Sequence, residues 1–135
     1  MAHWLVKSEP NTYSFDDLVR DRGTVWDGVR NNAAALHLKA MKAGEEVLFY
    51  HSQEGKAVVG VAKVSKTAFP DKSDPTGRFV AVELKPVRAL DKEVTLADMK
   101  AEPKLAGMEM LRQSRLSVSP VSDDQWKTIL KMAGG

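Results

Sequence analysis

The sequence contains no cysteine among its 135 residues. This absence excludes disulfide bonds, thiolate metal ligands and a cysteine nucleophile. No stretch approaches the ~18 consecutive apolar residues of a membrane-spanning helix, and the first residues, MAHWLVKSEP, lack the basic and apolar regions of a secretion signal. We therefore expect a cytoplasmic protein without a disulfide framework and without a membrane anchor.

Sequence motifs for several kinds of chemistry are also missing. The chain has no glycine-rich phosphate loop, no GxSxG nucleophile elbow and no HExxH zinc helix. The three histidines, His3, His37 and His51, are isolated from one another, and no pair has the spacing of metal ligands on one helix face. We expect neither a metal nor a tightly bound cofactor.

Charge of one sign is not concentrated along the chain. The 20 basic residues nearly balance the 18 acidic ones, giving a formal net charge of +2, and both kinds are spread evenly. The segment 112–120 is a local exception, with two arginines and no acid. A protein that covers a long duplex needs many phosphate contacts from a basic surface. If this protein binds nucleic acid, a pocket for one nucleotide fits the composition better.

The pattern of apolar and turn residues predicts a single α+β domain over residues 1–135. About five or six mostly antiparallel strands should form a curved sheet or small barrel with several flanking helices. Strands are expected at 1–7, 24–26, 45–52, 56–65, 79–88 and 115–120, and helices at 15–21, 29–43, 95–102, 108–114 and 122–133. Capping boxes at Ser14 and Ser122 mark two of the helix starts.

The most strongly patterned helix is the one predicted over residues 29–43. Its apolar positions recur at helical spacing, and Gly44 is expected to end it. The predicted inward face consists of Val29, Ala33, Leu36 and Ala40.

Polar and aromatic side chains gather where predicted strands end and where this helix starts. An aromatic ring offers a stacking face for any base, while amides, hydroxyls and helix-start N–H groups can read the edge of a base. Individual residues also have structural roles open to them, because Trp26 fits a hydrophobic core equally well and Asn31 can cap the helix. The candidate ligand-binding residues from this pattern are Lys7, Ser8, Glu9, Trp26, Asp27, Asn31, Tyr50, His51 and Ser52.

Several segments, taken in order, resemble the EVE domain family. They are WLVKSEP, YSFDDL, VWDGVRN, MKAGEEVLFYHS, VVGVAKV, FPD and the long run from VTLADMKAEP to VSDDQW, and together they extend from Trp4 to Trp126. The resemblance implies a PUA-like fold related to the YTH domains, which read methylated adenine in RNA. It further implies a non-enzymatic module that reads a modified base in nucleic acid or a nucleotide, with modified cytosine in DNA as the ligand of some members.

The resemblance also assigns roles to residues of this chain. The aromatic wall falls on Trp26, and the group that reads the base edge falls on Asn31. Arg115 and Ser117 match a further recurring family motif and are expected to border the same cleft. The chain departs from the family pattern over Asn32–Leu36, so no ligand contact beyond Asn31 is implied for that helix. Contacts at the strand ends fall on Lys7, Ser8, Tyr50, His51 and Ser52.

Two other classes of function stay open on the sequence alone, as does the choice between DNA, RNA and a free nucleotide as the ligand. An enzyme acting on a small molecule or nucleotide would use His51 with Glu9 or Asp27 as an acid–base pair. A protein-interaction domain would use its methionines at the surface. A cleft wide enough for a base between Trp26 and Tyr50 would favour the reader.

Overall fold

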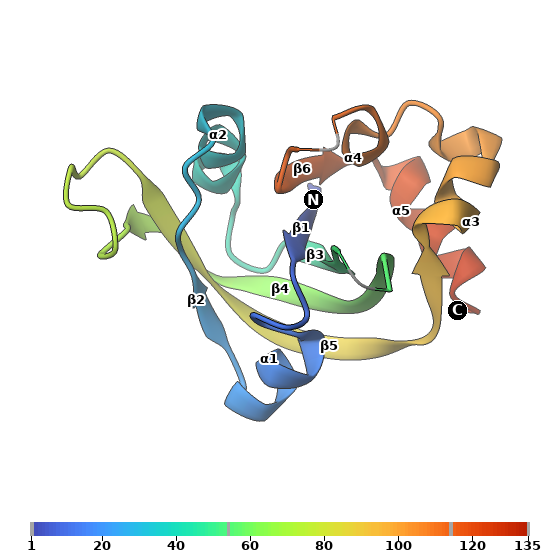
Figure 1. Cartoon of the computed structure of the whole chain (residues 1–135), viewed down its shortest axis with the longest axis horizontal. Helices are drawn as coiled ribbons and strands as arrows, with labels where there is room; N and C mark the ends of the chain where they lie inside the picture. Colours follow the sequence, from blue (N-terminus) through green and yellow to red (C-terminus); the bar gives the residue numbers. More distant parts are fainter. Residues whose placement is uncertain (1, 54, 114, 135) are drawn as a thin grey trace.

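A computed structural model describes residues 2–53, 55–113 and 115–134 as a curved six-stranded sheet with helices packed on both faces (Figure 1). The strand order is β2-β5-β4-β3-β1-β6. The strands are β1 (His3–Ser8), β2 (Thr24–Trp26), β3 (Glu46–His51), β4 (Ala57–Pro70), β5 (Val80–Thr95) and β6 (Val118–Val121). The helices are α1 (Phe15–Asp21), α2 (Asn32–Ala40), α3 (Leu96–Ala101), the 3₁₀ turn η1 (Pro103–Leu105), α4 (Glu109–Arg112) and α5 (Asp123–Met132).

The sheet is antiparallel except between β1 and β3, which run parallel. Parallel strands end at the same edge, so Lys7 lies opposite Tyr50 and Ser8 opposite His51. The long β4–β5 pair carries several register shifts, which bend the strands and curve the sheet. The expected α+β curved sheet is confirmed. The sheet stays open, with β2 and β6 at its edges, so the curved sheet and not the closed barrel is observed.

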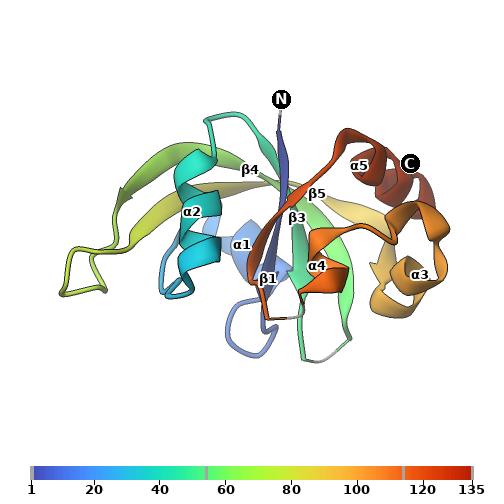
Figure 2. The ribbon, with the colours of Figure 1, turned by 90° about the horizontal axis from the view of Figure 1, so that it is seen from above.

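Each face of the sheet has its own hydrophobic core. Because side chains alternate along a strand, Val6 and Phe49 face one core while Leu5 and Tyr50 face the other. Helices α1 and α2 cover the first face, and α3, α4 and α5 cover the second. Figure 2 shows α2 well separated from α3 and α5, with the central strands between them. A side chain on β3 is therefore committed to one core by its position alone.

Local capping fixes the starts of three helices. The capping boxes expected at Ser14 and Ser122 are confirmed, and each serine side chain accepts a backbone N–H from the third helical residue. A third box opens α3 at Thr95. These starts depend on residues within four positions of each other.

The prediction for α2 was wrong in both its length and its buried face. The helix covers only Asn32–Ala40, and Leu36, which was expected to face the core, is 64% exposed. Val29 and Arg30 lie in the connection before the helix, because Asp71 binds this connection from a distant loop. The helix packs instead on Ala34, Ala35 and Leu38.

The methionines do not support the protein-interaction alternative. They were expected at the surface, but four of them are at most 2% exposed, so that expectation was wrong. The buried methionines are Met41, Met99, Met108 and Met110. Among the residues described, no helix is both long and apolar enough to cross a membrane.

Candidate functional site

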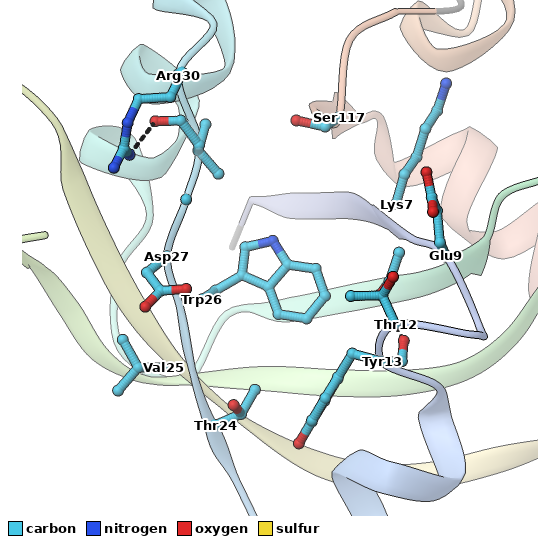
Figure 3. A pocket seen from close by; sticks show the side chains of 13 residues that line it. Lys7, Glu9, Thr12, Tyr13, Thr24, Val25, Trp26, Asp27, Arg30 and Ser117 are labelled. Atoms are coloured by element: carbon cyan, nitrogen blue, oxygen red, sulfur yellow. Dashed lines mark hydrogen bonds between the residues drawn. The ribbon is translucent and has the colours of Figure 1, made fainter. Parts of the chain in front are cut away.

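A pocket of about 570 Å³ opens between the end of β1, strand β2 and the connection to α2 (Figure 3). This volume lies within the ~300–1,000 Å³ range of small-molecule sites. The predicted residues that line it are Lys7, Ser8, Glu9, Trp26, Asp27 and Ser117. The lining residues that the sequence did not single out are Thr12, Tyr13, Thr24, Val25, Gly28, Val29 and Arg30.

Trp26 forms the central wall of this pocket and is half-buried (Figure 3). Its ring meets the buried ring of Phe49 edge to face, with 5.5 Å between the ring centroids and 81° between the planes. Its indole nitrogen makes no hydrogen bond to any residue that the structure describes. Trp26 is therefore both core and wall: the hydrophobic core fixes its orientation, and the rest of the side chain remains available to a ligand.

The connection from β2 to α2 is held by the buried carboxylate of Asp71. One carboxylate oxygen accepts the backbone N–H of Gly28 at 2.9 Å and the Arg30 guanidinium at 3.0 Å. The other accepts the amide and hydroxyl of Ser73 at 2.8 and 2.6 Å. Burial alone would raise the pKa of Asp71, but the hydrogen bonds from Ser73, Gly28 and Arg30 outweigh it and hold that pKa far below its ordinary value. Asp71 is therefore ionised and ties the pocket wall to the β4–β5 loop.

Arg30 has little donor capacity left for a ligand. Besides Asp71, its guanidinium donates to the Ser73 hydroxyl at 3.1 Å and to the carbonyl of Val29 at 3.2 Å. It also packs over the Phe79 ring at 5.3 Å. Arg30 thus acts mainly as a brace at one end of the pocket.

The opposite wall is a tight turn that follows β1. The carbonyl of Glu9 accepts the backbone N–H groups of Thr12 and Tyr13 at 2.9 and 2.8 Å. The Ser8 hydroxyl donates to the carbonyl of Tyr13 at 2.5 Å, and the amide of Lys7 donates to the carbonyl of Ser117 at 2.9 Å. Ser8 therefore shapes the wall, while this backbone bond brings Ser117 to the pocket. The turn residues Pro10 and Asn11 are the sequence signal that could have found Thr12 and Tyr13.

His51 makes a structural contact, and its contact with a ligand remains a prediction. Its Nε2 accepts the backbone N–H of Phe15 at 3.0 Å, and its ring packs edge to face on Phe49 at 5.8 Å. Burial lowers the pKa of His51, which favours the neutral ring that this contact requires. Within the described part of the chain, no hydrogen bond joins His51 to Glu9 or Asp27. The Nε2 atom of His51 is therefore occupied by the Phe15 amide and not by either of these carboxylates.

Tyr50 and Ser52 lie outside the Trp26 pocket. They line a second hollow, of about 240 Å³, on the other face of the sheet. The cleft between Trp26 and Tyr50 that would have favoured the reader is not formed by the described residues, because Tyr50 alternates with Phe49 along β3 and Trp26 packs on Phe49. Lys7 lines both pockets and is the side chain they share.

Asn31 and Arg115 also lie away from Trp26, in a separate hollow of about 310 Å³. The side-chain oxygen of Asn31 accepts the backbone N–H of Ala34 at 3.0 Å, which makes Asn31 the N-cap of α2. Ala33 lines the same hollow. The ligand contacts of Asn31 and Arg115 remain predictions. In the described residues, no group of three or more histidines or carboxylates is arranged to hold a metal ion.

The sequence model of the EVE domain matches residues 2–132. The chain belongs to the EVE domain family. A protein from Rhodopseudomonas palustris, solved by NMR, is 48% identical to this EVE domain with a TM-score of 0.94, covering 99% of this chain and 94% of that one. Human thymocyte nuclear protein 1 (THYN1) is 30% identical over 97% of this chain and 73% of its own length.

Two structures of complexes resemble this EVE domain. Human THYN1, crystallised with DNA containing 5-methylcytosine, is 30% identical with a TM-score of 0.91, covering 100% of this chain and 99% of that one. The YTH domain of Zygosaccharomyces rouxii MRB1 is 18% identical with a TM-score of 0.62, covering 99% of this chain and 85% of that one. The family expected from the sequence is confirmed, and the YTH neighbour shows the related fold.

Proposed function

We propose that this EVE domain is a non-enzymatic reader that holds one modified base of a nucleic acid against Trp26. The observation that carries the proposal is the combination at Trp26 of a ring braced by Phe49, an indole N–H without a partner among the described residues, and an open pocket in front of it. Stacking a base on such a ring contributes about 1–3 kcal/mol for any base. A pocket of about 570 Å³ also has room for a base.

Selection among bases needs polar groups around the stacked ring. The hydroxyls of Thr12, Thr24 and Ser117 line the pocket, and each can donate or accept a hydrogen bond at the edge of a base. The indole N–H of Trp26 adds a donor. This EVE domain needs no bond-making step for such a role, and His51 is engaged with the backbone of Phe15.

The base must leave its stack to reach Trp26. Unstacking and unpairing cost a few kcal/mol and cost least in a single strand or at a weakened pair. The human relative crystallised with DNA containing 5-methylcytosine supports modified cytosine as the first base to test. We therefore propose that this EVE domain prefers a modified base in single-stranded or locally opened nucleic acid.

The test is a titration of 5-methylcytidine, cytidine and matched short oligonucleotides against wild type, Trp26→Ala and Trp26→Phe. Wild type should prefer the modified base. Trp26→Ala should weaken binding by about 1–3 kcal/mol through lost stacking. Trp26→Phe should retain part of the affinity, because it keeps a stacking face but removes the indole donor.

Thermal unfolding of the same proteins separates a pocket effect from a folding effect. Trp26→Ala also removes the contact with Phe49, so a modest fall in the melting temperature is expected. Equal affinity of wild type for modified and unmodified bases across a panel of modifications would overturn the proposed function. So would unchanged affinity in folded Trp26→Ala.

A further inference from the structure

The second pocket, of about 240 Å³, is strongly basic for a chain with so little net charge. Three of the described residues that line it are lysines and none is acidic. The lysines are Lys7 at the end of β1, Lys56 just before β4 and Lys100 on α3. Its other lining residues are Tyr50, Ser52, Gln53, Leu96, Met110 and Leu111. Cations and hydroxyls, with no acid among the described lining residues, are the composition of an anion site.

Lys7 connects this pocket to the one in front of Trp26. It lines both, and its ammonium group lies 5.9 Å from the centre of the Tyr50 ring in the second pocket. In Figure 3 its side chain rises at the rim of the Trp26 pocket, beside Glu9 and across from Ser117. An extended ligand that leaves the first pocket at this rim meets Lys7 before it reaches the other two lysines.

Lys56 and Lys100 are held near each other by the backbone. The amide of Leu96, at the start of α3, donates to the carbonyl of Lys56 at 2.9 Å. Both lysines are exposed, and neither forms an ion pair with a residue that the structure describes. Arg30, at the other end of the Trp26 pocket, is in contrast bound to Asp71 and Ser73. The positive charge that can bind an anion is therefore that of Lys56 and Lys100 and not that of Arg30.

We infer that the second pocket binds a phosphate group of the strand whose base is held against Trp26. The strand then runs from the Trp26 pocket over Lys7 toward Lys56 and Lys100. This inference rests on the proposed function and adds the direction of the strand and the place of its backbone. It requires only a few phosphate contacts, in keeping with the small net charge.

The test compares three ligands that carry the same preferred base. They are the free nucleoside, a trinucleotide with that base in the middle, and the same trinucleotide with uncharged methylphosphonate linkages. The double variant Lys56→Gln/Lys100→Gln should bind the charged trinucleotide roughly tenfold more weakly than wild type at low salt, as two exposed charge contacts would give. It should bind the nucleoside and the uncharged trinucleotide as wild type does.

Salt dependence gives a second readout for the same variant. Each phosphate contact on a single strand contributes about 0.7 to the slope of log affinity against log salt, so two lost contacts should reduce the slope by about 1.4. Lys127→Gln/Lys131→Gln is the matched control, because it removes two charges from α5, in a hollow that shares no described lining residue with either pocket. This control should leave both affinity and slope near the wild-type values.

The outcomes separate this inference from the proposed function. Base-dependent binding that needs Trp26 but is unaffected by Lys56→Gln/Lys100→Gln overturns the phosphate site alone. Equal losses in that variant and in the α5 control also overturn it, since they reflect net charge and not a site. If no ligand shows base-dependent binding, the proposed function and the phosphate site are both overturned. The phosphate site is defined by its position beside the bound base, and it cannot stand without that base.

Discussion

Asp71 should be essential to the pocket although it does not line it. Replacement by asparagine keeps its size but gives the buried group one oxygen and one NH₂ in place of two oxygens. If the oxygen stays toward Ser73, the NH₂ meets the donors of Gly28 and Arg30; if it turns, the amide of Ser73 loses its acceptor. Either orientation leaves at least one donor unmatched.

The expected cost of Asp71→Asn follows from the contacts that it removes. Hydrogen bonds to a charged group contribute about 1.5–3 kcal/mol each. The Arg30 side chain is 41% exposed and can regain water, so its share is at the low end. We expect Asp71→Asn to lower the free energy of unfolding by about 2–4 kcal/mol. The freed connection between β2 and α2 should also weaken binding of a modified base.

The assay is urea unfolding followed by titration of the preferred nucleoside at a temperature where each variant is folded. Asp74→Asn is the matched control, since Asp74 organises the same loop through Thr76, Arg78 and Phe79 but does not contact the pocket wall. The control should lose stability without losing affinity per folded molecule. Unchanged stability and affinity in Asp71→Asn would refute this account of the wall.

Acid gives a further check on Asp71. Its folded-state pKa is depressed, so its contribution to stability is complete above the unfolded pKa of about 3.9 and declines as the pH falls below it. The stability difference between wild type and Asp71→Asn should therefore be constant near neutral pH and shrink below about pH 4. A difference that instead grew in acid would contradict the assignment.

Three further predictions concern the support of the pocket and can be measured by urea unfolding. Gly60→Ala should cost about 1–3 kcal/mol, because a Cβ there would overlap the Phe15 ring. Glu45→Gln should destabilise the start of β1, because the Glu45 carboxylate accepts hydrogen bonds from the Trp4 indole and two backbone amides. Burial alone would raise the pKa of Glu45, but these hydrogen bonds lower it. The loss of stability should therefore fade below about pH 4.3, where the carboxylate becomes protonated. His51→Ala should destabilise the start of α1, because it removes the acceptor of the Phe15 backbone N–H. Burial lowers the pKa of His51, so the loss of stability caused by this substitution should be complete above about pH 6.5 and shrink as the pH falls.

Each of these predictions has a result that would contradict it. An unchanged unfolding midpoint for Gly60→Ala would show that the Phe15 ring has room to move. A loss in Glu45→Gln that is the same at acidic and neutral pH would show that the carboxylate charge is not involved. A pH-independent effect of His51→Ala would mean that protonation does not disturb its contact with Phe15.

The parts of the fold that the sequence predicted correctly depend on neighbouring residues. A capping box is complete within four positions, so Ser14 and Ser122 located two helix starts correctly. The start of α2 was predicted too early, at Val29, although Asn31 offered a local cap that the structure uses. Arg30 belongs to a helical pattern in the sequence, yet its partner Asp71 is 41 positions away. The contacts of Asp71 with Gly28 and Arg30 hold this connection outside the helix.

The candidate site was predicted in part for the same reason. Lys7, Ser8 and Trp26 line one pocket. They could be predicted from the sequence because strand ends and the turns that follow them are recognisable from neighbouring residues. Tyr50 was placed there because it stands at the end of a predicted strand, but its face of the sheet depends on which core receives Phe49. That choice becomes clear only when the helices on both faces are known.

The parallel pairing of β1 with β3 has a consequence for how the site forms. The chain between the two strands contains α1, β2 and α2, so the whole Trp26 wall lies inside one crossover connection. The ladder from His3 to Ser8 therefore joins strands that are far apart in the sequence, and closing so long a loop costs chain entropy before its hydrogen bonds can form. We expect the Trp26 wall to be complete only once this ladder has formed. A base that binds this wall would then stabilise the folded molecule and not the unfolded chain.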